Sequence, residues 1–281
     1  MPGLIKRDYL TNYHSVHPDL TGKLKPTNIR MDIPSYETCT FCTMSNTRNS
    51  HSANDGTNDR EILDQRPTAF LVPNKYSLFS NDSNFLAITE KHASSIEDLT
   101  LNELTDLFTI IQRKYLSLSP SPFAFINVGL QAGGSNPHLH SQIVDTPFKP
   151  NAALLALRDH EPIKKDIRRS KEENLILIQE QNVTAYVPSS PTVSGEVRLA
   201  SSSLDYALPV LKHLLSSISS KHRWAYNLIP TFSHVPSSNA PTLLLQWLPR
   251  FDQGTIYQLY FQTAVQSINS KEYAAMIRDT L

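Results

Sequence analysis

Two histidines separated by a single residue carry the most distinctive chemistry in this sequence. His138 and His140 lie two residues apart, so on an extended backbone both imidazoles point to the same face. The glycine pair Gly133 and Gly134 precedes them, and Gln142 follows two residues after the second histidine. Packing does not require such a set. Because a neutral imidazole is nucleophilic at pH 7, the pattern indicates a catalytic site.

The flanking residues predict where these groups sit in the fold. Apolar residues alternate over 123–128, which predicts a strand, and Ile143 and Val144 continue an apolar pattern after the histidines. A glycine-rich loop therefore enters a second strand at the histidines. In such a loop the amides of Gly133 and Gly134, together with Ser135, can hold a phosphate. Gln142 is a neutral donor placed to hydrogen-bond a phosphoryl oxygen.

The run Ser135-Asn-Pro-His138-x-His140-x-Gln142 resembles the active-site signature of the galactose-1-phosphate uridylyltransferase branch of the histidine triad superfamily. The hydrolase branch has a third histidine where this chain has Gln142, which favours transfer over hydrolysis. The resemblance covers roughly residues 37–281. It implies an α+β fold of two tandem histidine-triad-like halves, each an antiparallel sheet with flanking helices.

The resemblance also implies a reaction and its participants. A nucleoside monophosphate would pass from a nucleotide sugar to a sugar 1-phosphate through a covalent nucleotidyl intermediate on His140. Asn127 matches a family position near the phosphates, Asn74 one near the ribose or base, and Gln266 a substrate glutamine. Family members are commonly dimers, so a homodimer is an expectation. The implied setting is carbohydrate metabolism.

The two cysteines, Cys39 and Cys42, stand at the spacing of a C-x-x-C motif. Without a secretory signal, such a pair is more typical of metal binding or redox chemistry than of a structural disulfide. A tetrahedral Zn²⁺ site would need two more ligands from among the ten histidines, because no second cysteine pair exists. The family resemblance implies a structural zinc ion held by Cys39, Cys42, His92 and His138.

Charge and hydropathy exclude several classes of partner. The chain has 281 residues, with 26 basic and 26 acidic ones, so no overall field attracts nucleic acid or an anionic membrane. The first residues form no apolar targeting segment, and no later apolar run reaches the roughly 18 residues of a membrane span. We therefore expect a soluble, cytoplasmic protein without nucleic-acid or membrane partners.

Further elements follow from periodicity. Thr100 and Glu103 form a capping box, and apolar residues at helical spacing predict a helix over 101–117. Residues 1–36 read as a loop-rich arm, and 43–66 as a surface loop. Strands are predicted over 68–73, 84–89, 174–179, 184–187, 223–229 and 242–247, and helices over 152–157, 204–220 and 271–281.

The second half of the chain repeats the order of the first, which indicates an internal duplication. Asn227 echoes Asn127, and the segment 243–246 takes the place of the histidine signature without keeping its histidines. One active site per chain is the consequence. We place the domain boundary near residue 170, giving a catalytic domain over 1–170 and a second domain over 171–281.

Two alternatives remain open at this point. Inorganic phosphate can replace the sugar phosphate as acceptor, which would make the protein a phosphorylase of an ADP-sugar or a dinucleoside polyphosphate. The chain can also be a non-catalytic nucleotide-binding module that keeps the zinc and the fold. Labelling of the protein by a nucleotide separates the last alternative from the other two.

Overall fold

The computed structural model describes most of the two predicted halves and parts of the N-terminal region. The described residues are 4–7, 14–17, 39–42, 61–75, 83–118, 122–134, 136–146, 160–222, 224–235, 240–250 and 269–281. Ser135, Gln266 and the helix predicted over 152–157 lie outside them. All structural statements below concern the described residues.

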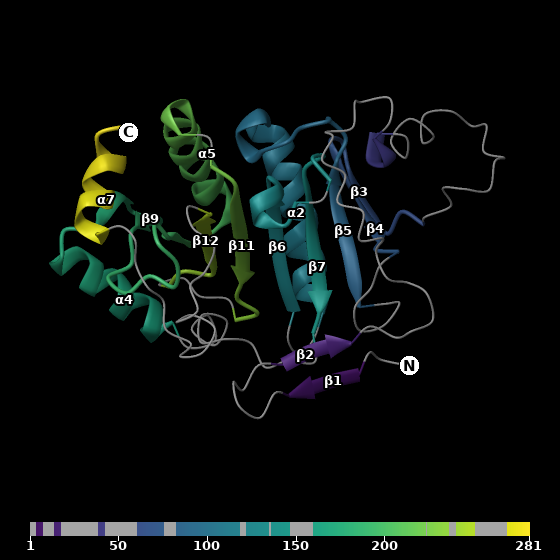
Figure 1. Ribbon diagram of the computed structural model, residues 1–281, viewed down its shortest axis with the longest axis horizontal. Coiled ribbons are helices and arrows are strands. Elements are labelled where there is room, and N and C mark those ends of the chain that lie inside the picture. Colours follow the sequence, from purple (N-terminus) through teal and green to yellow (C-terminus); the bar gives the residue numbers. More distant parts are fainter. Residues whose placement is uncertain are drawn as a thin grey trace.

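One continuous antiparallel sheet forms the centre of the molecule (Figure 1). Its order is β3-β4-β5-β7-β6-β11-β12-β10-β9-β8, so the first five strands come from the N-terminal half and the last five from the C-terminal half. The strands are β3 (Asp64–Arg66), β4 (Ala69–Pro73), β5 (Asn84–Thr89), β6 (Pro122–Val128), β7 (His140–Asp145), β8 (Ile176–Glu180), β9 (Val183–Tyr186), β10 (Val197–Ser201), β11 (Tyr226–Phe232) and β12 (Leu243–Pro249).

The strand order confirms the predicted α+β architecture of two tandem halves. Read from the two outer edges inward, β3-β4-β5-β7-β6 and β8-β9-β10-β12-β11 have the same connectivity. The halves meet where β6 pairs with β11, and Asn127 and Asn227 are direct partners in that register. β12 therefore takes the place in its half that the histidine strand β7 takes in the first. The boundary near residue 170 stays a prediction.

Two long helices cover one face of the sheet. α2 (Leu101–Ser117) begins at Thr100, whose capping box with Glu103 is present as predicted. α5 (Leu204–Lys221) packs beside it, and the buried faces of both helices join the sheet in one hydrophobic core. α7 (Ser270–Arg278) buries Tyr273 and Ile277 in the same core near β8. Among the described residues, no helix combines the length and apolarity needed to cross a bilayer.

The opposite face of the sheet is covered differently in the two halves. In the N-terminal half, the turn 39–42 lies against residues of β4 and β5 in a separate apolar cluster. In the C-terminal half, α4 (Glu161–Glu172) packs there through Ile163 against Tyr186, Ala200 and Leu244. The expected boundary near residue 170 thus falls within α4, which contacts β8 and β9.

Most predicted elements are found with small changes in their bounds. β3, α4 and β10 were not predicted. β3 lies in the segment 43–66 expected to be a surface loop, α4 lies where the domain boundary was placed, and the residues of β10 form a short run without a clear alternation. In the arm expected to be loop-rich, β1 (Leu4–Arg7) and β2 (His14–His17) pair as an antiparallel hairpin. Two short 3₁₀ helices, η2 (Ile96–Asp98) and η3 (Leu130–Ala132), and helical residues at 40–42 are also present.

Candidate active site and metal centre

The glycine-rich loop between β6 and β7 has a shape that side chains would prevent. Gly129 and Gly133 both have φ of +83°, a region that L-residues rarely adopt. A Cβ on Gly134 would lie 2.8 Å from the carbonyl oxygen of Gly129. The N–H of Gly133 donates to Leu130 O at 2.9 Å, and that of Gly134 donates to Gly129 O at 3.0 Å. These two amides donate within the loop, and their predicted donation to a phosphate stays a prediction.

His140 opens β7 with one ring nitrogen already occupied. Its Nδ1 lies 2.8 Å from the backbone carbonyl oxygen of His138, which can only accept, so Nδ1 carries the proton and donates. Nε2 therefore holds the lone pair. The ring is half-buried, and the edge of Phe41 packs against it with the ring centroids 5.1 Å apart. This hydrogen bond orients the ring, and in the neutral imidazole it leaves Nε2 as the nitrogen with the lone pair.

Two polar side chains lie on the same face as the His140 ring. Gln142 is two residues further along β7 and pairs with Phe125 and Leu86 on the neighbouring strands. Continuing the register that pairs Ile126 with Ser141 places Asn127 beside His140 on β6. Gln142 and Asn127 therefore flank His140 on one face of the sheet, and their contact with a phosphoryl group stays a prediction.

Asn74 is not brought close to this group. Its backbone N–H donates to Asn84 O at 2.9 Å, and Asn84 pairs with Val144, four residues along β7 from His140. At about 3.3 Å per residue, this places Asn74 roughly 13 Å along the sheet from the nucleophile. A contact between Asn74 and the base or ribose stays a prediction.

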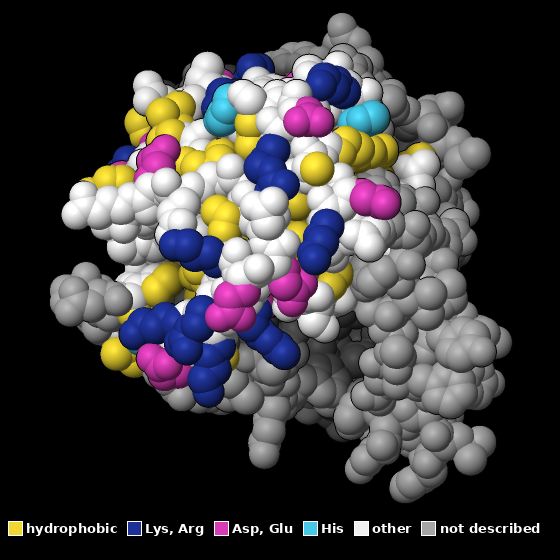
Figure 2. Space-filling model, turned by 90° about the vertical axis from the view of Figure 1, so that its left-hand side faces the viewer, with side chains coloured by type: hydrophobic (Ala, Val, Ile, Leu, Met, Phe, Trp, Pro, Cys, Tyr) yellow, Lys and Arg dark blue, Asp and Glu magenta, His cyan; other side chains and the backbone are white. Residues whose placement is uncertain are grey.

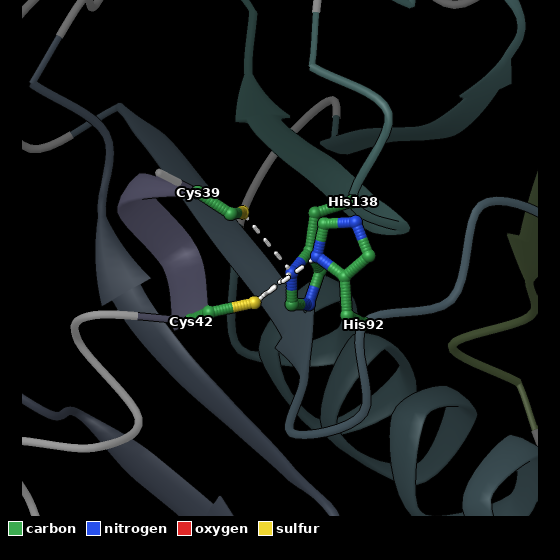
Figure 3. A group of neighbouring side chains, drawn as sticks. All are labelled: Cys39, Cys42, His92 and His138. Atoms are coloured by element: carbon green, nitrogen blue, oxygen red, sulfur yellow. Dashed lines mark hydrogen bonds between the residues drawn. The ribbon is translucent and has the colours of Figure 1, made fainter. Parts of the chain in front are cut away.

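The four predicted metal ligands come together at one point (Figure 3). Their ligand atoms all lie within 4.8 Å of one another, and three of the four residues are buried. The Sγ atoms of Cys39 and Cys42 lie 3.5 and 3.4 Å from His138 Nδ1, and Cys42 Sγ lies 3.1 Å from His92 Nδ1. Tetrahedral zinc coordination needs separations of roughly 3.3–3.8 Å between ligand atoms. Cys39, Cys42, His92 and His138 can therefore hold a metal ion.

The protonation of the side chains in this cluster is compatible with the binding of a cation. The Nε2–H of His138 donates to Thr89 O at 2.7 Å, which leaves the Nδ1 lone pair facing the sulfur atoms. Burial lowers the pKa of His138 to about 4, so the ring is neutral at pH 7. Burial also raises the pKa of the Cys42 thiol to about 12, and Cys39 acts in the same direction. A bound cation would reverse the second effect by stabilising the thiolate.

Three further residues at the site were not among the predicted site residues. Phe41 belongs to the C-x-x-C turn and contacts both His138 and His140 with its ring edge. Asn227 and Arg250 come from the C-terminal half and connect to Asn127 by hydrogen bonds. The echo between Asn127 and Asn227 was the only signal in the sequence that could have indicated one of them.

Comparisons with known proteins agree with this fold. Residues 57–161 match the family model described as the Ap4A phosphorylase N-terminal domain. Among solved structures, a uridylyltransferase is 18% identical, with a TM-score of 0.67 and 98% of each chain covered. An ADP-glucose phosphorylase from Arabidopsis thaliana, solved with bound ADP-glucose, is 16% identical, with a TM-score of 0.65 and 99% of each chain covered. No curated protein sequence matches the chain.

These likenesses establish that the chain has the fold of the uridylyltransferase, over nearly its full length. The resemblance predicted from the histidine signature is thereby confirmed at the level of the fold. The residues matched by the family model include His92, His138 and His140, so they contain the predicted nucleophile and two of the four predicted metal ligands.

Proposed function

We propose that the protein is a nucleotidyltransferase that carries a nucleoside monophosphate on His140. The observation that carries this proposal is the hydrogen bond from His140 Nδ1 to the carbonyl of His138. It fixes the tautomer, so Nε2 is an aimed nucleophile beside two amide side chains. A binding module needs no such arrangement.

The reaction would proceed in two balanced displacements. Nε2 of His140 attacks the α-phosphorus of the donor nucleotide, a P–N bond forms, and the bond to the departing phosphate oxygen breaks. An oxygen of the acceptor phosphate then attacks the same phosphorus and the P–N bond breaks. Gln142 and Asn127 would donate hydrogen bonds to the phosphoryl oxygens as their charge grows.

Two acceptors fit this scheme. With a nucleotide sugar as donor, a sugar 1-phosphate would accept the nucleotidyl group, as in a galactose-1-phosphate uridylyltransferase. With inorganic phosphate as acceptor, the protein would be a phosphorylase of an ADP-sugar or a dinucleoside polyphosphate. The match of residues 57–161 to the Ap4A phosphorylase domain specifically supports the second candidate.

We further propose that the metal is zinc and that its role is structural. Two thiolates and two imidazoles form a closed tetrahedral set that leaves no position for substrate. The bound ion would stabilise the turn 39–42 and the ring of His138. Because the carbonyl of His138 holds His140, the metal site would orient the nucleophile without touching the substrate. Ser135, Gln266, the homodimer and the cytoplasmic location remain predictions from the sequence.

Intact-protein mass spectrometry after incubation with UDP-glucose, ADP-glucose or Ap4A tests the proposal. We expect a mass increase of one nucleotidyl group with one of these donors, lost on adding a sugar 1-phosphate or inorganic phosphate. His140→Asn should show no adduct, whereas His213→Asn, an exposed histidine of α5, should behave like the wild type. A folded, metal-loaded protein without an adduct from any donor would favour the nucleotide-binding module instead.

A further inference from the structure

The second half of the chain reaches the active-site loop at the junction of the two halves. Asn227 of β11 is the register partner of Asn127 on β6, and only 7% of its surface is exposed. Arg250 follows β12, where its backbone N–H continues the pairing by donating to Ala225 O. Arg250 is two residues beyond Leu248, the cross-strand partner of Asn227, so its side chain lies on the same face.

Hydrogen bonds connect these residues in one direction. Nε of Arg250 donates to Oδ1 of Asn227 at 2.5 Å. Nδ2 of Asn227 then donates to Oδ1 of Asn127 at 2.6 Å and to the backbone oxygen of Ala132 at 2.8 Å. Ala132 belongs to the glycine-rich loop, so the buried amide of Asn227 joins both halves to that loop.

The groups at the two ends of this series of hydrogen bonds, Arg250 and the carbonyl of Ala132, allow only one orientation of the amide of Asn227. A guanidinium can only donate, so Asn227 must turn its oxygen toward Arg250. A backbone carbonyl can only accept, so Asn227 must turn its nitrogen toward Ala132. The same nitrogen faces Asn127, which must therefore present its oxygen to Asn227 and its own nitrogen to the other side.

The amide of Asn127 is therefore fixed with its nitrogen, the hydrogen-bond donor, turned away from Asn227. One hydrogen on its Nδ2 reaches Gly133 O at 3.4 Å, and the second has no acceptor among the residues that the structure describes. The neighbouring strand on that side is β7, which begins with His140. A cation at the head of such a chain also polarises the bonds that follow it, which strengthens the final donor.

We propose that Asn227 and Arg250 are positioning residues that hold Asn127 as a hydrogen-bond donor to the phosphoryl oxygen of the nucleotide. The inference rests on the proposed function, because it concerns the phosphate transferred to His140. It assigns the C-terminal half, which lacks the histidine signature, a part in the reaction. The two residues act through Asn127 and need not touch the substrate.

A double-mutant cycle on the rate of His140 nucleotidylation tests this proposal. Asn127→Ala should lower the single-turnover rate by roughly 100-fold, the effect of losing one donor to a developing charge. Asn227→Ala should lower it by roughly tenfold, since Asn127 keeps its side chain but loses its fixed orientation. In the double variant, Asn227→Ala should lower the rate of Asn127→Ala by less than about twofold further, because the side chain that Asn227 positions is already removed. Independent losses that multiply would overturn the proposal.

Arg250 gives a second, graded measurement. Arg250→Gln keeps an N–H donor for Asn227, whereas Arg250→Met removes it, so the methionine variant should be several-fold slower than the glutamine variant. We expect the loss in the rate constant and not in the dissociation constant of the donor nucleotide. Equal rates for the two Arg250 variants would contradict the role of the donor.

The control variant is Asn182→Ala, in the turn between β8 and β9, which should match the wild type. Unfolding midpoints and metal content of every variant should stay close to the wild-type values, and Asn227→Ser replaces Asn227→Ala if the latter does not fold. An absence of adduct in the wild type would refute the proposed function itself. An adduct formed by Asn227→Ala and Asn227→Ser at the wild-type rate would refute only the inference.

Discussion

Strands β7 and β12 occupy equivalent places in the two halves. On the face of the sheet opposite α2 and α5, however, the two strands carry polar residues in different environments. On β7, His140 and Gln142 are half-buried near the cluster of Cys39, Cys42, His92 and His138. On the same face of the C-terminal half, α4 covers the sheet, and Gln246 of β12 donates to the fully buried Glu196 at 3.0 Å. The first half leaves these polar groups half-buried, whereas the second half buries them and pairs them with each other.

The paired groups of the second half form an ion network. Arg198 donates to Glu196 at 2.7 Å and to Asp166 of α4 at 2.8 Å, and Tyr186 OH donates to Asp166 at 2.9 Å. Burial alone would raise the pKa of Glu196, but the charge and hydrogen bonds of Arg198 outweigh it and lower that pKa. On the solvent side of this half, Figure 2 shows Lys and Arg interspersed with Asp and Glu. The comparison teaches that, in a fold of two similar halves, a position in one half can serve chemistry while the equivalent position in the other half serves stability.

Metal removal should produce the largest difference between the halves. Chelation should lower the unfolding midpoint by roughly 10 °C, because several kcal/mol of ligand-linked stability are lost. Nucleotidylation of His140 should fall with it. Amide exchange should accelerate in β5 and β7 while β10 and β12 keep their protection. Equal acceleration in both halves would show that the metal site supports the whole sheet.

Breaking the ion network should affect stability and leave the chemistry intact. Glu196→Ala leaves the guanidinium of Arg198 without its buried partner, which should cost about 3–5 kcal/mol. The single-turnover rate of the folded variant should equal that of the wild type. Urea unfolding and adduct formation measure the two effects, with the exposed Glu180→Ala as the matched control. A lost rate at unchanged stability would place this network in the reaction.

A lower pH should distinguish the two halves, because His138 of the N-terminal half should make the stability depend on pH. The unfolded ring takes up a proton near pH 6.5 but the buried ring only near pH 4, so the unfolded state binds more protons between these values. The contribution of His138 to the free energy of unfolding is therefore fully present above pH 6.5. It is lost as the pH drops, and the loss reaches about 3 kcal/mol at pH 4 and below. Urea unfolding of the metal-free protein at several pH values measures this. The slope should flatten in His138→Gln, and an unchanged slope would refute the assignment.

The smallest expected effect concerns Phe41, which belongs to the turn 39–42 and contacts the ring of His140. Phe41→Leu removes the ring-edge contact with His140, worth about 1 kcal/mol, so the nucleotidylation rate should fall roughly fivefold. Metal content should not change, because both cysteines remain. Phe123→Leu on β6 is the matched control. A loss of metal in Phe41→Leu would show that the ring supports the cluster and not the histidine.

Local signals in the sequence predicted much of this architecture. The capping box of Thr100 and Glu103 fixed the start of α2, and the apolar residues of β5 gave its bounds. The four metal ligands came from the C-x-x-C spacing combined with the family resemblance. β10 was missed because Val197–Ser201 is buried on both faces and lacks a period of two.

What could not be predicted depends on contacts between distant strands. The donors and acceptors of Asn127, Asn227 and Arg250 are set by the pairing of β6, β11 and β12, which no local pattern encodes. The engagement of the Gly133 and Gly134 amides within their loop likewise depends on how the chain folds back toward Gly129. Residue types indicated the chemistry, whereas the register determines which groups face each other.

The pairing of β6 with β11 also has a consequence for the N-terminal half on its own. Without the C-terminal half, β6 would become an edge strand, and the part of it at Ile126, Asn127 and Val128 that now pairs with β11 would lose its partner. Such an edge is a template for association with other copies. The C-terminal half therefore covers an edge of the N-terminal half that would otherwise be open to such association.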